Sequence, residues 1–256
     1  MSCTVVCDLD GVIYLGDEAV PGAGDALGVL RDAGHQVLFC TNNSSRTRQE
    51  SADKITRVTG FETAVDQVAS SAMAAGRLLG GGRVIVVGGS GVREAVELSG
   101  GTIVDDGPAD AVVVGIDFHF DYDLLDRASA AIRHGARFVA TNTDETYPTP
   151  TGLRPGAGAI VAAIAAASGV DPDVAGKPEP TMRNLIREMA TGHTVFMVGD
   201  RPETDLAMAR AEGWISVLVE SGVTAPGAEV TPAPDHVIAD ITRMPDLVQD
   251  ALSTTS

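Results

Sequence analysis

Positive charge is scarce in this chain, and lysine is scarcer still. Among 256 residues, 18 are Lys or Arg against 35 Asp or Glu, which gives a formal net charge of −17 at pH 7. A protein that neutralises the phosphates of a nucleic acid polymer, or that binds an anionic membrane, needs a basic face. No stretch of the sequence concentrates Lys and Arg enough to supply one. The composition therefore argues against nucleic acid polymers and membranes as partners.

Long hydrophobic runs and a leader segment are also lacking. The longest wholly apolar run, residues 159–167, has nine residues, whereas a helix needs ~20 to cross a bilayer. The opening Met1-Ser2-Cys3-Thr4 lacks the basic and apolar regions of a secretory signal, so we expect a cytoplasmic protein. The odd number of cysteines, three, fits that compartment. We expect Cys7 and Cys40 to be small buried strand residues.

The remaining composition is that of a folded protein with an α/β pattern. Hydrophobic residues make up 44% of the chain and charged residues 21%, and a chain of this length can form one large domain or two small ones. Short β-branched runs alternate with helical periodicity, which predicts a doubly wound, Rossmann-like parallel sheet with helices on both faces. The expected strands are 4–7, 36–40, 67–69, 84–87, 111–115, 138–140, 194–198 and 215–219. The expected helices are 21–34, 45–58, 72–79, 92–99, 122–134, 157–167, 181–189 and 204–211.

Two stretches that contain glycine or proline divide the alternating pattern of expected strands and helices. Gly80-Gly81-Gly82 and residues 170–176 stand at the two ends of the middle region. We therefore expect a core domain of residues 1–81 and 176–256, interrupted by an inserted α/β cap domain of residues 82–175.

A pair of aspartates follows the first expected strand, in Asp8-Leu9-Asp10-Gly11. In open parallel sheets, ligands bind outside the carboxyl ends of the strands. One carboxylate there could hold a hard cation or attack an electrophile, while its neighbour donates or removes a proton. A pair of turn-forming aspartates is the structural alternative.

Two further segments stand just before expected helices. Thr41-Asn42-Asn43-Ser44 offers hydroxyls, amides and backbone N–H groups, which form either a helix cap or an anion site. Lys177 lies between a glycine and a proline, and only Lys54 shares its residue type among the 18 basic residues. A lysine in a rigid turn favours a site that needs a compact point charge, with an exposed loop lysine as the alternative.

A second strand-end aspartate follows the apolar strand 194–198. Gly199-Asp200 repeats the placement of Asp8, which favours a functional carboxylate. Asp205 stands five residues further on, in the first turn of an expected helix, where it could simply complement the helix dipole.

Together, these motifs resemble those of the haloacid dehalogenase superfamily of phosphohydrolases. The insertion before Lys177 further resembles the class II subgroup with a C2-type α/β cap, which contains p-nitrophenyl phosphatases, pyridoxal phosphate phosphatase and phosphoglycolate phosphatase. The segments that match the superfamily are Asp8-Leu9-Asp10-Gly11 for motif one, Thr41-Asn42 for motif two, Lys177 for motif three, and Gly199-Asp200 with Asp205 for motif four. Besides the insertion, the segments that resemble the subgroup are residues 12–21, Thr41-Asn42-Asn43-Ser44 and Ser221-Gly222-Val223-Thr224.

The resemblance implies a Mg²⁺-dependent phosphatase that hydrolyses small phosphomonoesters through an aspartyl-phosphate intermediate. Asp8 would be the nucleophile, and Asp10 would protonate the leaving oxygen and then activate water. Mg²⁺ would be held by the carboxylates of Asp8 and Asp200 and by the backbone carbonyl of Asp10, an oxygen-only ligand set that suits this ion.

The resemblance also implies a phosphate site. Thr41, Asn42 and Asn43 would bind phosphate oxygens, and Lys177 would neutralise the phosphoryl group and the nucleophile. Asp205 would orient Lys177 or a metal-bound water. The substrate would be a small phosphorylated metabolite.

Other interpretations stay open at this point. A phospho-accepting signalling domain uses a similar aspartate, metal and lysine, although Asp10 and the long insertion count against it. A phosphotransferase or phosphomutase would replace water by an acceptor alcohol. Residues 141–158 resemble the cap loop that faces the active site in this subgroup, with an ordinary surface loop as the alternative. A homodimer formed through the cap is a further expectation.

Overall fold

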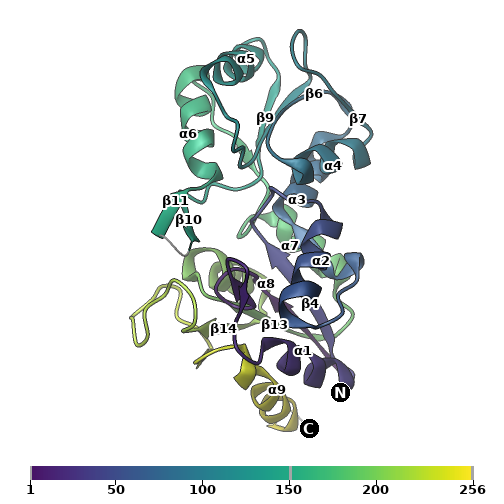
Figure 1. Ribbon diagram of the computed structural model, residues 1–256, viewed down its shortest axis with the longest axis vertical. Helices are drawn as coiled ribbons and strands as arrows, with labels where there is room; N and C mark the ends of the chain where they lie inside the picture. The colour runs from purple at the N-terminus through teal and green to yellow at the C-terminus, as the bar shows by residue number, and fades with distance from the viewer. Residues whose placement is uncertain (1, 150–151, 255–256) are drawn as a thin grey trace.

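Two parallel sheets, each covered by helices, make up the molecule. The structure is a computed structural model that describes residues 2–149 and 152–254. In Figure 1 the first sheet and its helices occupy the lower part of the view, and the second sheet with its helices occupies the upper part. All neighbouring strands within both sheets run parallel.

The first sheet places its earliest strand at the centre. Its order is β15-β14-β13-β1-β4-β5. The bounds are β1 (Cys3–Cys7), β4 (Gln36–Thr41), β5 (Val68–Ser70), β13 (Thr194–Gly199), β14 (Ile215–Val219) and β15 (His236–Ile238). Because β1 lies between β4 and β13, the segments that follow these three strands meet at one edge of the sheet.

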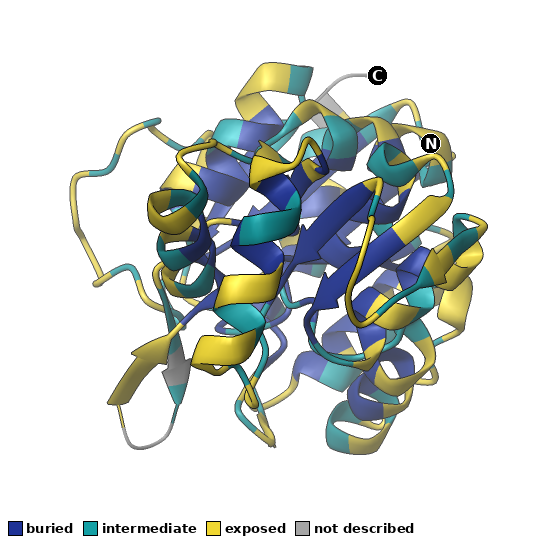
Figure 2. Ribbon diagram, turned by 90° about the horizontal axis from the view of Figure 1, so that it is seen from above, coloured by how far each residue is buried: buried dark blue, intermediate teal, exposed yellow. Residues whose placement is uncertain are grey.

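Helices cover both faces of this sheet because its strands alternate between two cores. The β1 residues Val5 and Cys7 belong to one apolar cluster, and Val6 belongs to the other. The first cluster includes residues of α1 (Ala23–Asp32), α2 (Arg48–Thr59) and α9 (Met244–Thr254). The second includes residues of α3 (Ser71–Leu79), α7 (Pro180–Met189) and α8 (Ala207–Glu212). Figure 2 shows the buried strands enclosed between helices whose outer faces are exposed.

The second sheet lies within the inserted region. Its order is β12-β9-β8-β6-β7. The bounds are β6 (Gly82–Val87), β7 (Gly101–Ile103), β8 (Ala111–Val114), β9 (Arg137–Ala140) and β12 (Asp173–Val174), and the helices are α4 (Ser90–Leu98), α5 (Tyr122–Arg133) and α6 (Ala157–Ser168). The antiparallel hairpin of β10 (Thr146–Thr149) and β11 (Gly152–Pro155) extends from this part toward the first sheet (Figure 1).

The two parts share one apolar cluster. Val84, Val92 and Val96 of the inserted part pack in the same cluster as Val6 and the buried residues of α3 and α7. Close approach of α3 and α4 requires a glycine, since a Cβ on Gly76 would lie 2.9 Å from the backbone oxygen of Ala95. Burial of shared apolar surface therefore fixes the insertion on the core.

The expected fold class is confirmed: a doubly wound parallel core carries an α/β cap. The domain limits at 81/82 and 175/176 stay a prediction. The helix expected from residue 45 begins at Arg48 because Thr47 and Glu50 form a capping box there. The helix expected over 204–211 is divided into the π-helical turn η2 (Pro202–Leu206) and α8.

The structure contains elements that the sequence patterns did not predict. They are short strands and terminal elements, which carry weak periodicity. Besides β7, β10, β11 and β12, they are the hairpin of β2 (Tyr14–Leu15) and β3 (Glu18–Ala19), the strand β15, the 3₁₀ turns η1 (Val65–Gln67) and η3 (Ile241–Arg243), and the helix α9.

Cys7 and Cys40 are buried strand residues without a disulfide, as predicted. Burial raises the pKa of the Cys40 thiol to about 12, so it stays protonated and inert. No helix in the described ranges is long and apolar enough to span a membrane.

Candidate active site

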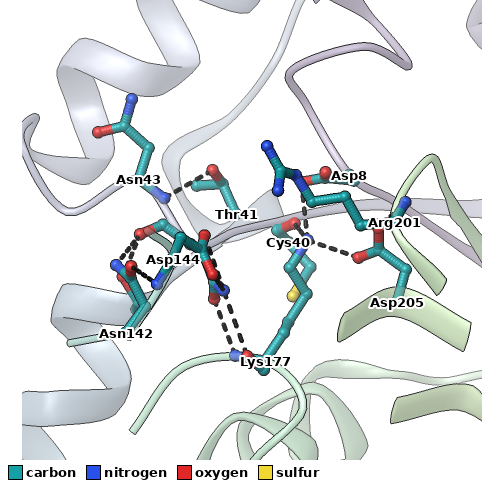
Figure 3. Close-up of polar contacts among 11 residues, drawn as sticks. Asp8, Cys40, Thr41, Asn43, Asn142, Asp144, Lys177, Arg201 and Asp205 are labelled. Carbon is teal, nitrogen blue, oxygen red and sulfur yellow. Dashed lines mark hydrogen bonds and ion pairs between the residues drawn. The ribbon is translucent and has the colours of Figure 1, made fainter. Parts of the chain in front are cut away.

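A buried ammonium group contacts the segments that follow β1 and β13 and the last residues of β4. The Nζ atom of Lys177, between β12 and α7, lies 2.8 Å from Oδ1 of Asp8 and 2.7 Å from Oδ1 of Asp205. It also donates to the backbone oxygen of Cys40 at 3.0 Å (Figure 3). An ammonium group has three donors, and these three acceptors use all of them.

The charge of Lys177 is stabilised by its partners. Burial alone would lower the pKa of this lysine, but the carboxylates of Asp205 and Asp8 outweigh burial and hold it well above its ordinary value. Asp205 is itself fixed, because its Oδ2 accepts from the backbone N–H of Arg201 at 3.2 Å. A Cβ on Gly199 would lie 2.2 Å from the Asp205 carboxylate, which explains the glycine at this strand end.

Asp200 offers an oxygen atom without a partner. Its Oδ1 is buried and makes no hydrogen bond in the part of the chain that the structure describes. Its Oδ2 accepts from the backbone N–H of Val223 at 2.8 Å. Burial and the nearby charge of Asp8 raise the pKa of Asp200 to about 6. A buried carboxylate oxygen with no donor is an incomplete arrangement that a cation would complete.

The residues present fit a hard divalent cation. Carboxylate oxygens of Asp8, Asp200 and Asp205 lie within 4.8 Å of one another. Both carboxylate oxygens of Asp205 already have donors, Lys177 and the backbone N–H of Arg201. Within the described ranges Asp8 is paired only through Oδ1 and Asp200 only through Oδ2. Asp8 and Asp200 are therefore the carboxylates left to hold an ion, in an oxygen-only donor set of the kind that Mg²⁺ prefers. The carboxylate of Asp10 does not belong to this described acidic group. The contribution of its backbone carbonyl to a metal site stays a prediction.

Asp10 has a different environment. Burial, and then the charge of Asp8, raise the pKa of Asp10 to about 6, although Lys54 and Arg46 act in the opposite direction. A carboxyl group with a pKa near neutrality can both give and take a proton. The acid–base role that the motif implies for Asp10 stays a prediction, and a raised pKa is the property that this role needs.

The side-chain amide of Asn42 makes hydrogen bonds to both the core and the cap. Its Oδ1 accepts from the backbone N–H of Lys177 at 2.8 Å. Its Nδ2 donates to the backbone oxygen of Lys177 and to both carboxylate oxygens of Asp144, each at 3.2 Å. Its side-chain amide is thus paired within the described ranges, and so is its backbone oxygen. The backbone N–H of Asn42 is the group that it can offer for the predicted contact with phosphate.

The neighbouring predicted residues also have local partners. Thr41 accepts at Oγ1 from the backbone N–H of Asn43 at 3.0 Å, which leaves its hydroxyl hydrogen free to donate. Asn43 accepts at Oδ1 from the backbone N–H and hydroxyl of Ser45, and its side chain points away from Lys177 (Figure 3). These local bonds shape the turn before α2.

Two residues of the cap loop 141–158 contact the site. The sequence indicated this loop but assigned no role to an individual residue in it. Asn142 donates from Nδ2 to the backbone oxygen of Asn42 at 2.7 Å. Asp144, the carboxylate partner of Asn42, has a pKa raised mainly by burial. This loop therefore contacts the phosphate segment of the core, and the ordinary surface-loop alternative is wrong for these residues.

A cavity of about 460 Å³ opens above these groups, between the core and the cap. All the predicted catalytic and substrate-binding residues line it: Asp8, Asp10, Thr41, Asn42, Asn43 and Lys177. The cap contributes Ile116, Phe118, Tyr147 and Arg154. Lys54, Arg46 and Arg201 line it as well, and they were not among the predicted site residues.

Comparison with known proteins identifies the family. Residues 5–102 match a family model described as haloacid dehalogenase-like hydrolase, and residues 174–244 match a second model described as HAD-hydrolase-like. The acid sugar phosphatase of Staphylococcus saprophyticus is 35% identical over 223 residues, which are 85% of this chain and 86% of that relative. The chain belongs to the haloacid dehalogenase-like hydrolases. Within that family it is a phosphatase, a phosphoric monoester hydrolase.

Solved structures agree with the predicted subgroup. The p-nitrophenyl phosphatase from Archaeoglobus fulgidus has a TM-score of 0.86 at 29% identity, covering 95% of this chain and 98% of that chain. The glycerol phosphate phosphatase of Mycobacterium tuberculosis, in complex with magnesium, has a TM-score of 0.84 at 36% identity, covering 93% of this chain and 74% of that chain.

The packing around Asp200 generates the first prediction. A Cβ on Gly222 would lie 2.1 Å from Oδ2 of Asp200, so Gly222→Ala must displace this carboxylate. We expect the affinity for Mg²⁺, measured by calorimetric titration of the metal-free protein, to fall about tenfold or more. Gly28→Ala is the control, because a Cβ at this helical position meets nothing within 4 Å. Equal affinities of the two variants would contradict the placement of the ion at Asp200.

Proposed function

We propose that this phosphatase is Mg²⁺-dependent and hydrolyses small phosphomonoesters through an aspartyl-phosphate on Asp8. The observation that carries the proposal is the setting of the Asp8 carboxylate. Its Oδ1 lies 2.8 Å from the buried ammonium of Lys177, and the residue lines the cavity between core and cap. The unpartnered oxygen of Asp200 supports a cation beside it.

In the proposed reaction, Asp8 attacks phosphorus and forms a covalent acyl phosphate. Asp10 gives its proton to the leaving oxygen, and afterwards takes a proton from the water that attacks the aspartyl-phosphate. Lys177 holds the Asp8 carboxylate in place and balances the incoming negative charge, while Asp205 fixes Lys177. Splitting the displacement into two steps lets one aspartate serve first as acid and then as base.

Mg²⁺ would be held by the carboxylates of Asp8 and Asp200 and by the backbone carbonyl of Asp10. When bound, it would neutralise these carboxylates and the phosphate and align the phosphoryl group with the nucleophile. A third carboxylate, that of Asp205, lies beside these two ligands. With Asp10 protonated, the three carboxylates of Asp8, Asp200 and Asp205 balance the charges of the ion and Lys177, so these five groups together carry no net charge before the phosphate enters.

The phosphate would be bound by the hydroxyl of Thr41 and by the backbone N–H of Asn42, close to the turn that leads into α2. Asn43, whose backbone N–H donates to Oγ1 of Thr41, would hold that hydroxyl in place. The cavity of about 460 Å³ suits a small phosphorylated metabolite. The acid sugar phosphatase and glycerol phosphate phosphatase relatives support sugar or polyol phosphates as the substrate class. A cytoplasmic location and a homodimer through the cap stay predictions.

Asp8→Asn tests the nucleophile. An amide cannot attack phosphorus, so we expect the turnover of p-nitrophenyl phosphate to fall by more than about 10³-fold, with an unchanged circular dichroism spectrum. Asp53→Asn makes the same chemical change at an exposed position of α2 and should keep wild-type activity. Residual activity of the Asp8 variant within tenfold of wild type would refute the assignment.

Asp10→Asn tests the acid. The amide cannot donate a proton to the leaving oxygen, and general acid catalysis contributes about 10²–10⁴-fold. We expect kcat/KM to fall much more for glycerol 3-phosphate, an alkoxide leaving group, than for p-nitrophenyl phosphate, whose phenolate leaves without help. An equal loss for both substrates would argue against this role of Asp10.

A further inference from the structure

Both lysines of this chain, whose other 16 basic residues are arginine, are buried and line one cavity. The ammonium of Lys177 already donates all its hydrogens, to Asp8, Asp205 and the backbone oxygen of Cys40. Lys54, in α2, is only 6% exposed and lines the cavity with Asp10. Its charge is not used by the proposed mechanism.

The ammonium of Lys54 has weak partners. It lies 3.8 Å from the centroid of the Tyr14 ring and 3.9 Å from Oδ1 of Asp17, and it makes no hydrogen bond within the described ranges. A ring face replaces only part of the water that a buried cation gives up. Burial is accordingly the main reason why the pKa of Lys54 is lowered.

Asp17 does not neutralise the charge of Lys54. Its side chain is 75% exposed, and Arg57 approaches the same Oδ1 atom at 3.7 Å. An exposed carboxylate at such distances contributes little. Lys54 therefore keeps all three donors for a group in the cavity.

Arg46 adds a second cation to the same wall. Its side chain is half-buried and lines the cavity, and it forms no ion pair or hydrogen bond with any residue that the structure describes. Lys54 lies over the ring of Tyr14, whose backbone pairs with that of Asp10, and Lys54, Arg46 and Asp10 all line the same cavity. Since Asp10 is the proposed acid for the leaving oxygen, these two cations lie in the cavity that the leaving alcohol must occupy.

We propose that Lys54, assisted by Arg46, binds a second anionic group carried by the leaving alcohol, so that the preferred substrates are small phosphomonoesters with an additional carboxylate or phosphate. The proposal rests on the proposed function, because it assigns the substrate class of the same site. An anion there supplies the hydrogen-bond acceptors that the buried ammonium lacks. Lys54 is thus a substrate-binding residue that sets specificity.

The test compares pairs of ligands that differ in the second anion. 3-Phosphoglycerate and glycerol 3-phosphate differ by a carboxylate against a hydroxymethyl group, and glucose 1,6-bisphosphate and glucose 6-phosphate differ by a phosphate. Inhibition constants against p-nitrophenyl phosphate hydrolysis report binding even for a compound that is not turned over. We expect the wild-type protein to prefer the more anionic member of at least one pair by about tenfold or more.

Variants on one helix separate the proposal from its alternatives. Lys54→Met should abolish the preference, and Lys54→Arg should restore most of it. Arg57→Met is the matched control, because it removes a cation beside Asp17 from the same helix and does not line the cavity; it should keep the wild-type preference. A Lys54 that acts only through Asp10 would change kcat for every substrate and leave the preference intact.

Two results would overturn the proposal: no preference for the more anionic member of either pair in the wild-type protein, or the same preference in Lys54→Met as in wild type. A wild-type protein that does not hydrolyse p-nitrophenyl phosphate would instead contradict the proposed function. Dissociation constants for the same pairs would then come from calorimetric titration, which still decides the role of Lys54.

Discussion

The ammonium of Lys177 is the interaction on which the rest of the site depends. One buried group binds the carboxylates of Asp8 and Asp205 and the carbonyl of Cys40, which follow or end three neighbouring strands of the first sheet. Two carboxylates this close would repel each other in a poorly solvated interior. The cation between them offsets this repulsion and holds both carboxylates in one position. The parallel order of β13, β1 and β4 is what brings these groups within reach.

Lys177 also connects the cap to the site residues of the core. Its backbone N–H and C=O both bind the side chain of Asn42, whose amide in turn reaches Asp144 of the cap loop. A shared apolar cluster around α3 gives the cap a second, non-polar attachment to the core. On the core side, ion pairs hold the groups that line the cavity, and on the cap side, apolar packing holds the cap in place. A bound substrate would therefore contact ordered groups on both sides.

Much of this could be predicted from the sequence because strand ends are local features. The β-branched runs and the polar residues after them identified Asp8, Thr41, Lys177 and Asp200, and parallel pairing then required them to meet. The commitment of the Asn42 amide to Lys177 and Asp144 depends on residues more than a hundred positions away, which no local pattern encodes. Lys54 gave one usable signal, the rarity of its residue type, but its burial beside Tyr14 appears only when α2 packs against the β2–β3 hairpin. The short hairpins and the π-helical turn η2 show too little hydrophobic periodicity to be predicted from the sequence.

Trapping of the covalent intermediate tests the central claim most directly. The protein would be quenched with acid during turnover of p-nitrophenyl phosphate and reduced with tritiated borohydride, which converts an aspartyl-phosphate to homoserine, and its peptides would then be mapped. The account predicts tritium in the peptide that contains residue 8, and at that residue. Turnover without incorporation of label, or label at another residue, would contradict Asp8 as the nucleophile.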